Sequence, residues 1–302
     1  MSKDFVRVID TDGNVLEHYI LKPGEELAVV NKKKELTDKQ IEFLNSNKEL
    51  KEYNESLGGF ITMCYIKNEL LFNHLNLELS NISRIIYLAT YLSYNDKEEG
   101  LLVCKIGNKN VPMTRQIMQT KLGLSDSTFE RFMTDVRKHE LIYSSERKYY
   151  INPKYFTKGK CEFDNKCYTR IYIDTTRFLF ENIKVSQHKQ LSYIFQLIPK
   201  IHYNINVVCK NPDEHDTNKI QKMTLTEICE FLNVSKNNAT NLKKNLLKFH
   251  VNVQGYKFHL FNYISIENSE TKRDYFAINP NLIWKGNNIN DIKDIIKCLF
   301  FS

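Results

Sequence analysis

The chain has 302 residues, of which 42% are hydrophobic and 12% aromatic, as in folded proteins. No apolar run reaches the roughly 18 residues that span a bilayer, and the N-terminus has no basic region followed by an apolar stretch. We therefore expect a cytoplasmic protein of two or three domains with no membrane partner.

The net charge of +7 is unevenly distributed along the chain. Residues 1–78 carry 10 basic and 14 acidic side chains, residues 79–182 carry 17 and 12, and residues 183–286 carry 14 and 8. The last sixteen residues are balanced. Residues 1–78 are therefore acidic, and residues 79–286 are basic. The excess positive charge of residues 79–286 favours a polyanionic partner for this part of the chain.

Residues 1–78 predict a small α+β segment that serves as a cap or a dimerisation element. The turn residues Asp10-Thr11-Asp12-Gly13-Asn14 are typical of a hairpin. The elements predicted around and after them are two strands, a helix and a third strand: Phe5–Ile9, Val15–Ile20, Glu35–Asn54 and Phe60–Ile66.

Residues 79–182 predict a helix, a second helix capped by Thr114, a short turn, a third helix and a hairpin. The turn is Gly123-Leu124-Ser125, with glycine where a helix C-terminus favours a left-handed residue and Ser125 as the next N-cap. The predicted ranges are Arg84–Leu92, Arg115–Leu122, Asp126–His139, and strands Leu141–Tyr143 and Tyr149–Ile151.

Residues 183–286 repeat this order. Met113-Thr114 recurs as Met223-Thr224, and Ile151-Asn152-Pro153 recurs as Ile278-Asn279-Pro280. The first offset is 110 residues and the second 127, so the second copy carries 17 extra residues, which we assign to a longer hairpin. Its predicted elements are Gln190–Ile201, Leu225–Leu232 capped by Thr224 or Thr226, Lys236–Phe249, Phe258–Ile266 and Tyr275–Ile278.

This order is the plan of a winged helix-turn-helix. The predicted fold class is α+β, with two tandem winged helix-turn-helix domains at 79–182 and 183–286. The segment 1–78 precedes them and a C-terminal helical tail at 287–302 follows.

The third helix of the second copy carries the densest candidate DNA contacts. Asparagine contacts adenine bidentately, and lysine reaches phosphate or guanine. No acidic residue occurs from Phe231 to Ile266. The alternative is a solvated helix face beside a basic hairpin. The candidates here are Lys236, Asn237, Asn238, Thr240, Asn241 and Lys244.

The first copy is less basic on its third helix, where Asp126, Glu130 and Asp135 accompany the polar candidates. It either reads bases or serves dimerisation or phosphate anchoring. Its candidates are Ser127, Thr128 and Arg131 on the helix, with Arg147 and Lys148 at the hairpin tip. In the second copy, the candidates for phosphate or minor-groove contacts are Lys257, Lys272 and Arg273.

No catalytic motif is found. The sequence has no Walker A loop, dinucleotide fingerprint, His-Glu-x-x-His or His-hydrophobe-His pair. The seven cysteines lack zinc-site spacing and are interpreted as reduced thiols. We expect no enzymatic activity, no metal site and no cofactor.

The chain resembles the tandem winged-helix replication initiators of plasmids and phages from low-GC Gram-positive bacteria. The resemblance rests on Thr114, Leu122-Gly123-Leu124-Ser125-Asp126-Ser127-Thr128 with its hairpin, and on Ile278-Asn279-Pro280 with Lys285-Gly286. It implies binding to repeated or inverted double-stranded origin sites, a dimer-to-monomer switch and recruitment of host replication proteins. A winged-helix transcription regulator and a protein-interaction scaffold are the alternatives.

Overall fold

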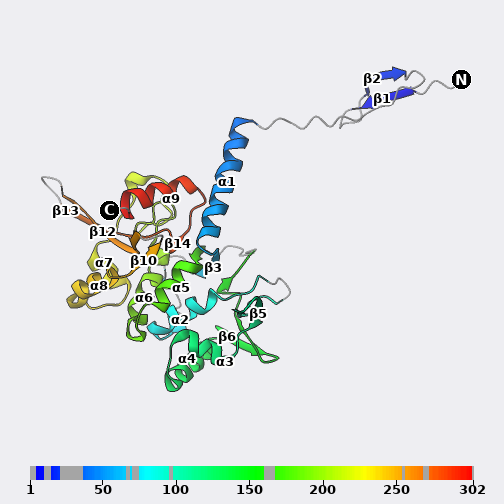
Figure 1. The fold of residues 1–302 in the computed structure, drawn as a ribbon. Helices are drawn as coiled ribbons and strands as arrows, with labels where there is room; N and C mark the ends of the chain where they lie inside the picture. The colour runs from blue at the N-terminus through cyan, green and yellow to red at the C-terminus, as the bar shows by residue number, and fades with distance from the viewer. Residues whose placement is uncertain are drawn as a thin grey trace. The chain divides into compact units, whose positions relative to one another are not determined.

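The structure is a computed structural model that describes residues 5–9, 15–20, 37–65, 69, 75–94, 98–159, 167–253, 256–267 and 272–300. It is a mixed α+β fold with small antiparallel sheets (Figure 1). The chain divides into two compact units, Met1–Phe43 and Leu44–Ser302.

The first unit contains the predicted N-terminal hairpin. Strands β1 (Phe5–Ile9) and β2 (Val15–Ile20) pair antiparallel with the bounds expected from the sequence, and a register shift follows Val8. Helix α1 (Asp38–Ser56) crosses the division between the units. The predictions of a hairpin and a following helix are therefore confirmed.

The second unit holds both copies of the repeat. The elements of the first copy are β3 (Phe60–Tyr65), α2 (Leu79–Ala89), β4 (Val103–Ile106), β5 (Lys109–Pro112), α3 (Arg115–Leu122), α4 (Asp126–Lys138), β6 (Ile142–Ser145), β7 (Lys148–Ile151) and β8 (Phe156–Thr157). The second copy begins with β9 (Cys167–Tyr172), α5 (Ile173–Glu181), η2 (Val185–Gln187), α6 (His188–Gln196), η3 (Ile198–Lys200), η4 (Thr217–Lys219) and α7 (Leu225–Phe231). It continues with η5 (Lys236–Asn238), α8 (Ala239–Leu246), β10 (His250–Val253), β11 (Tyr256–His259), β12 (Phe261–Glu267), β13 (Lys272–Ile278) and β14 (Ile283–Trp284). The C-terminal tail follows with α9 (Ile289–Ile295) and the π-helical η6 (Ile296–Phe300).

Backbone hydrogen bonds recur at equivalent places in the two copies. In the first copy, the amides of Ile151, Met113 and Asn152 donate to the carbonyls of Gly100, Leu102 and Leu141, respectively. In the second copy, the amides of Ile278, Met223 and Asn279 donate to the carbonyls of Asn206, Val208 and Leu260, respectively. Gly100 and Asn206 both have left-handed backbone, with φ of 82° and 52°. Asparagine tolerates this conformation better than most residues with a Cβ. The internal repeat read from the sequence is therefore present in the backbone hydrogen bonding.

The extra residues of the second copy are divided between two hairpins. Leu141 and Leu260 accept equivalent hydrogen bonds and are 119 residues apart, so nine of the 17 extra residues precede Leu260 and form the separate hairpin β10–β11. The other eight lengthen β12–β13 relative to its counterpart β6–β7, so the longer hairpin is confirmed and β10–β11 is an addition that the sequence did not predict. The predicted strand Phe258–Ile266 is broken at Leu260, whose amide donates to Phe249 O at 3.0 Å. An apolar pattern that continues through Leu260 does not reveal this break.

A four-stranded sheet joins the two copies, in the order β14-β9-β3-β8. The first strands of the copies, β3 and β9, pair antiparallel with Thr62 opposite Arg170. Both strands precede the domain starts predicted at residues 79 and 183, because the local sequence pattern does not show that each strand pairs with the other copy. The last strand of each copy pairs with its own first strand, β8 with β3 and β14 with β9. Exchanging the copies leaves this order unchanged, so they are related by an approximate two-fold axis through the β3–β9 pair.

Helices α2 and α6 pack against each other beside this sheet (Figure 1). At their contact, Ser83 N donates to Ser192 Oγ at 3.0 Å, and both residues are fully buried. Leu92 and Ile201 form equivalent β-bridges in the two copies. Ser83 and Ser192 each lie nine residues before these positions, so they occupy the same place in the repeat. The axis therefore also passes close to this helix pair.

The predicted C-terminal tail is helical and packs against the second copy. Ile289, Ile292 and Ile295 of α9 are buried with Trp284 of β14. Leu50 and Tyr53 of α1 pack against the same cluster, and Tyr53 Oη donates to Asn281 Oδ1 at 2.5 Å. The tail thus covers one face of the second copy.

His188 is buried at the α2–α6 contact beside a cation. Its ring stacks on Phe180 at 4.2 Å between centroids, and its Nδ1 accepts a hydrogen bond from Arg84 Nε at 3.3 Å. Burial, with a smaller contribution from Arg84, lowers the pKa of His188 from 6.5 to about 4. The neutral ring is therefore the form that the fold accepts.

We expect this histidine to make stability depend on pH. Above pH 6.5 His188 is neutral in both the folded and unfolded states and has no effect. Between pH 6.5 and 4 the unfolded state takes up the proton first, so His188 lowers the free energy of unfolding by about 3 kcal/mol in total.

Urea unfolding across this range should show that decline, and His188→Gln should remove it. An unchanged slope in His188→Gln, or an equal loss of slope in the exposed control His215→Gln, would contradict this account.

Candidate nucleic-acid interface

The third helix of the second copy is shorter than the sequence predicts. Instead of one helix over Lys236–Phe249, the structure has the 3-10 turn η5 followed by α8, which ends at Leu246. Ser235 makes no side-chain cap, and the asparagines that follow are poor helix formers. This weak helix start shortens the regular α-helix, so the predicted contact residues lie partly on η5 and partly on α8.

The predicted contact residues of this helix all face solvent. Leu242 and Leu246 are buried, and Ala239 is half-buried against the core. The exposed side chains are Lys236, Asn237, Asn238, Thr240, Asn241 and Lys244. In the described part of the chain, no hydrogen bond engages the side-chain amides of Asn237, Asn238 or Asn241. Their donors and acceptors are therefore available to a ligand.

Two lysines of this region are engaged by neighbouring groups. Lys236 Nζ lies 2.7 Å from Glu230 Oε1, and this hydrogen bond raises the pKa of Lys236. Lys243 Nζ lies 2.9 Å from the centre of the Tyr263 ring on β12. The stretch without acidic residues begins at Phe231, directly after Glu230. Lys236 lies within this stretch but still pairs with the Glu230 carboxylate just outside it.

Local capping positions the helix that precedes α8. Thr224 Oγ1 accepts a hydrogen bond from Glu227 N, and Glu227 Oε2 accepts one from Thr224 N at 2.8 Å. This capping box makes Thr224 the N-cap rather than Thr226. The turn after α7 contains Asn233 at φ 54°, and its counterpart Gly123 in the first copy has φ 64°.

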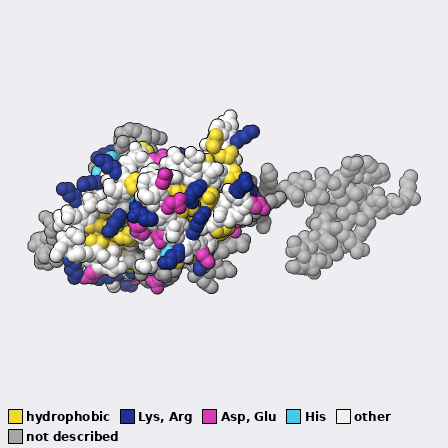
Figure 2. Space-filling model, turned by 90° about the horizontal axis from the view of Figure 1, so that it is seen from below, with side chains coloured by type: hydrophobic (Ala, Val, Ile, Leu, Met, Phe, Trp, Pro, Cys, Tyr) yellow, Lys and Arg dark blue, Asp and Glu magenta, His cyan; other side chains and the backbone are white. Residues whose placement is uncertain are grey.

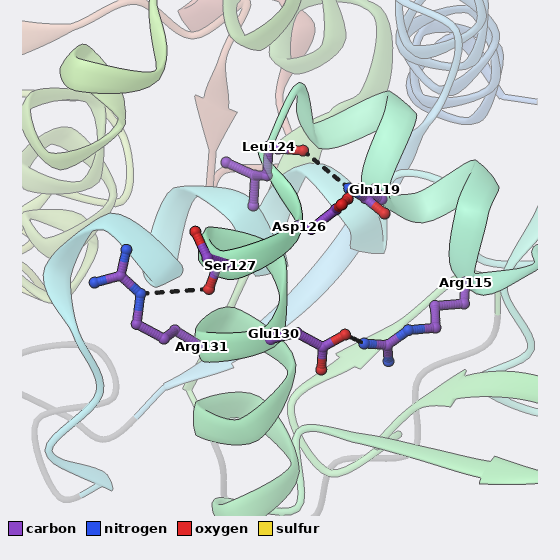
Figure 3. Close-up of polar contacts among 7 residues, drawn as sticks. All are labelled: Arg115, Gln119, Leu124, Asp126, Ser127, Glu130 and Arg131. Carbon is purple, nitrogen blue, oxygen red and sulfur yellow. Dashed lines mark hydrogen bonds and ion pairs between the residues drawn. The ribbon is translucent and has the colours of Figure 1, made fainter.

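In the first copy, two of the three acidic side chains of α4 contact α3 (Figure 3), while the third, Asp135, accepts a hydrogen bond from Asn81 Nδ2 of α2 at 2.6 Å. Asp126 Oδ1 accepts a hydrogen bond from Gln119 Nε2 at 2.6 Å, and Glu130 pairs with Arg115. Ser125 occupies the N-cap position, but its hydroxyl donates to Thr128 at 3.0 Å instead of accepting from a backbone amide. The Asp126 and Glu130 carboxylates therefore serve the packing of α3 against α4.

The remaining candidates of α4 are partly engaged within the helix. Ser127 and Arg131 are exposed, while Thr128 is half-buried. Arg131 Nε donates to Ser127 O at 3.4 Å (Figure 3). The Nη2 of the same guanidinium donates to Thr128 Oγ1 at 3.4 Å. The guanidinium thus lies against its own helix.

The β6–β7 hairpin and the start of α3 enclose an open groove of about 490 Å³. Arg147 is exposed at the hairpin tip and lines the groove, but Lys148 pairs with Glu98 at 2.5 Å, which raises the pKa of Lys148. The lining residues are Thr114, Arg115, Ser144, Ser145, Glu146, Arg147 and Tyr149. Only Arg147 among them was predicted, because the groove is formed by segments that are distant in the sequence.

The candidates on the second-copy hairpins are only partly described. Lys257 on β11 is exposed. Lys272 and Arg273 lie on β13, but their side chains fall outside the described residues. Figure 2 shows basic and acidic side chains interspersed on the face seen from below, so the positive charge does not form one uniform patch on that face.

Among the described residues, no group of three or more His, Cys, Asp and Glu side chains is placed to hold a metal ion. Five described cysteines are free thiols: Cys64, Cys104, Cys167, Cys209 and Cys229. Within the same part of the chain, no helix is long and apolar enough to cross a membrane.

No family model, curated protein or solved structure matches this chain.

The capping box of α7 gives a test of the local structure next to α8. Thr224→Ala removes the side-chain acceptor at the helix start and should lower the free energy of unfolding by about 1 kcal/mol. Thr226→Ala, an exposed neighbour within the same helix, should leave it almost unchanged. Chemical denaturation measures both values, and an equal loss in the two variants would show that Thr224 is not the N-cap.

Proposed function

We propose that the protein binds double-stranded DNA sequence-specifically through two tandem winged-helix domains, and that it acts as a plasmid or phage replication initiator. The observation that carries this proposal is the exposed face of η5 and α8. It presents amide and ammonium groups together on the side opposite the buried leucines. An α-helix fits the major groove, where amides read adenine and ammonium groups contact guanine or phosphate.

The internal symmetry supports recognition of paired half-sites. Each copy has a helix, a turn, a second helix and a hairpin, and an approximate two-fold axis relates the copies through β3 and β9. A duplex also has local two-fold axes, so protein symmetry is commonly matched by inverted half-sites. One chain would then take one half-site with α4 and the other with α8.

The two copies contribute unequally in this proposal. On α4, the Asp126 and Glu130 carboxylates are bound by side chains of α3, and the Arg131 guanidinium donates to a carbonyl of its own helix. We infer that the first copy mainly anchors phosphate through Arg147, while α8 provides most of the base contacts. Phosphate contacts fix register, and base contacts provide specificity.

Binding to DNA is tested by salt titration with a duplex from the region flanking the gene and a scrambled duplex. We expect the native duplex to bind more tightly and its affinity to fall steeply with salt. Weak and equal binding to both duplexes would overturn the proposal and favour an interaction scaffold. If binding is specific, a plasmid copy-number assay separates an initiator from a transcription regulator, which leaves copy number unchanged.

A pair of variants separates base reading from phosphate contact. Asn238→Ala should cost about 1–3 kcal/mol on the native duplex at one base step, with little effect on the scrambled one. Lys257→Ala should weaken both equally and reduce the salt slope by about one. The same titration measures both variants. Equal losses on the two duplexes for Asn238→Ala would remove Asn238 from the base-reading residues.

A further inference from the structure

The hairpin that only the second copy carries brings two histidines together. His250 begins β10, His259 ends β11, and the two are cross-strand partners. Their ring centroids lie 6.2 Å apart, with 54° between the ring planes. His259 is exposed and His250 is half-buried, so this pair is accessible from solvent.

Both rings are oriented by backbone carbonyls that directly follow α8. His250 Nδ1 lies 2.9 Å from Lys248 O, and His259 Nδ1 lies 3.2 Å from Leu247 O. A carbonyl oxygen only accepts hydrogen bonds, so each Nδ1 carries the proton and each neutral ring keeps its lone pair on Nε2. Histidines that bind metals are commonly oriented by such a hydrogen bond from the other ring nitrogen to a carbonyl.

We propose that His250 and His259 form a binding site for a divalent transition-metal ion such as Ni²⁺ or Zn²⁺. Imidazole nitrogen suits these ions rather than Mg²⁺ or Ca²⁺. With bonds from Nε2 to the metal of about 2.1 Å, the centroids of two rings on one ion lie roughly 4.5–5.5 Å apart. The observed centroids are 6.2 Å apart, so the two side chains would turn toward each other to share one ion, with water in the remaining positions.

The surroundings define how the ion binds. No acidic residue lies between Phe231 and Ile266 in the sequence, and Lys248 and Lys257 are exposed beside the pair. The site thus has two protein ligands and no carboxylate from its own segment, which favours modest affinity. A bound ion would fasten the two ends of the β10–β11 hairpin together at the C-terminus of α8.

The test is a calorimetric titration of the reduced full-length chain with Ni²⁺, in the absence of DNA. We expect one saturable site, weakened at least about tenfold in both His250→Gln and His259→Gln. His215→Gln should bind as the wild type does, since this exposed histidine lies outside the pair. Cys167→Ser controls for binding by the one thiol that is not fully buried among the described cysteines, and it should also leave the affinity unchanged.

Zn²⁺ should raise the thermal unfolding midpoint of the wild type and leave that of the two histidine variants unchanged. Should a variant fail to fold, ¹⁵N imidazole spectra of the wild type provide the test, because metal binding must shift both Nε2 signals. No saturable binding to the wild type, or full binding by both histidine variants, would overturn the site. Since DNA is absent, this outcome is independent of whether the proposed function holds.

Discussion

The antiparallel pairing of β3 with β9 is the constraint on which the rest of the second unit depends. It places Thr62 opposite Arg170 and allows each copy to add its own last strand at an outer edge. On the neighbouring helices, Ser83 and Ser192 are buried at the same contact, where a polar group needs a partner and finds one in its counterpart. The two copies therefore share one sheet and one helix pair, instead of being joined only by a linker.

Around this shared centre the copies have diverged on their outer faces. Tyr143 and Tyr150 are stacked on the first-copy hairpin, and Tyr143 is 44% exposed. The corresponding positions on β12 and β13 are Asn262 and Ala277, and Ala277 is buried in the cluster that contains α9. The second copy thus has an added covering helix, an added hairpin and a more basic third helix. These differences support the unequal roles that we propose for the two copies.

Features encoded within a few residues were predictable from the sequence. Thr114 is the N-cap and Gly123 is left-handed at the helix end, as the sequence predicts, and Thr224 is one of the two N-caps that the sequence left open, because these positions depend on local backbone chemistry. The pairings of Lys236 with Glu230 and Lys148 with Glu98 were missed, because the partners come from other elements. The β10–β11 hairpin was missed because its apolar pattern continues directly into β12. The sheet that the two copies share could not be predicted, because a local sequence pattern does not indicate which distant strands pair.

The proposed function requires that the exposed face of η5 and α8 contacts DNA bases. Hydrogen exchange of backbone amides, measured with and without the duplex flanking the gene, tests this contact. Binding through this face should give the strongest protection in residues 235–246 and weaker protection at the β6–β7 hairpin, with the β3–β9 pair unchanged. Protection confined to α4, or none in residues 235–246 at saturating duplex, would contradict it.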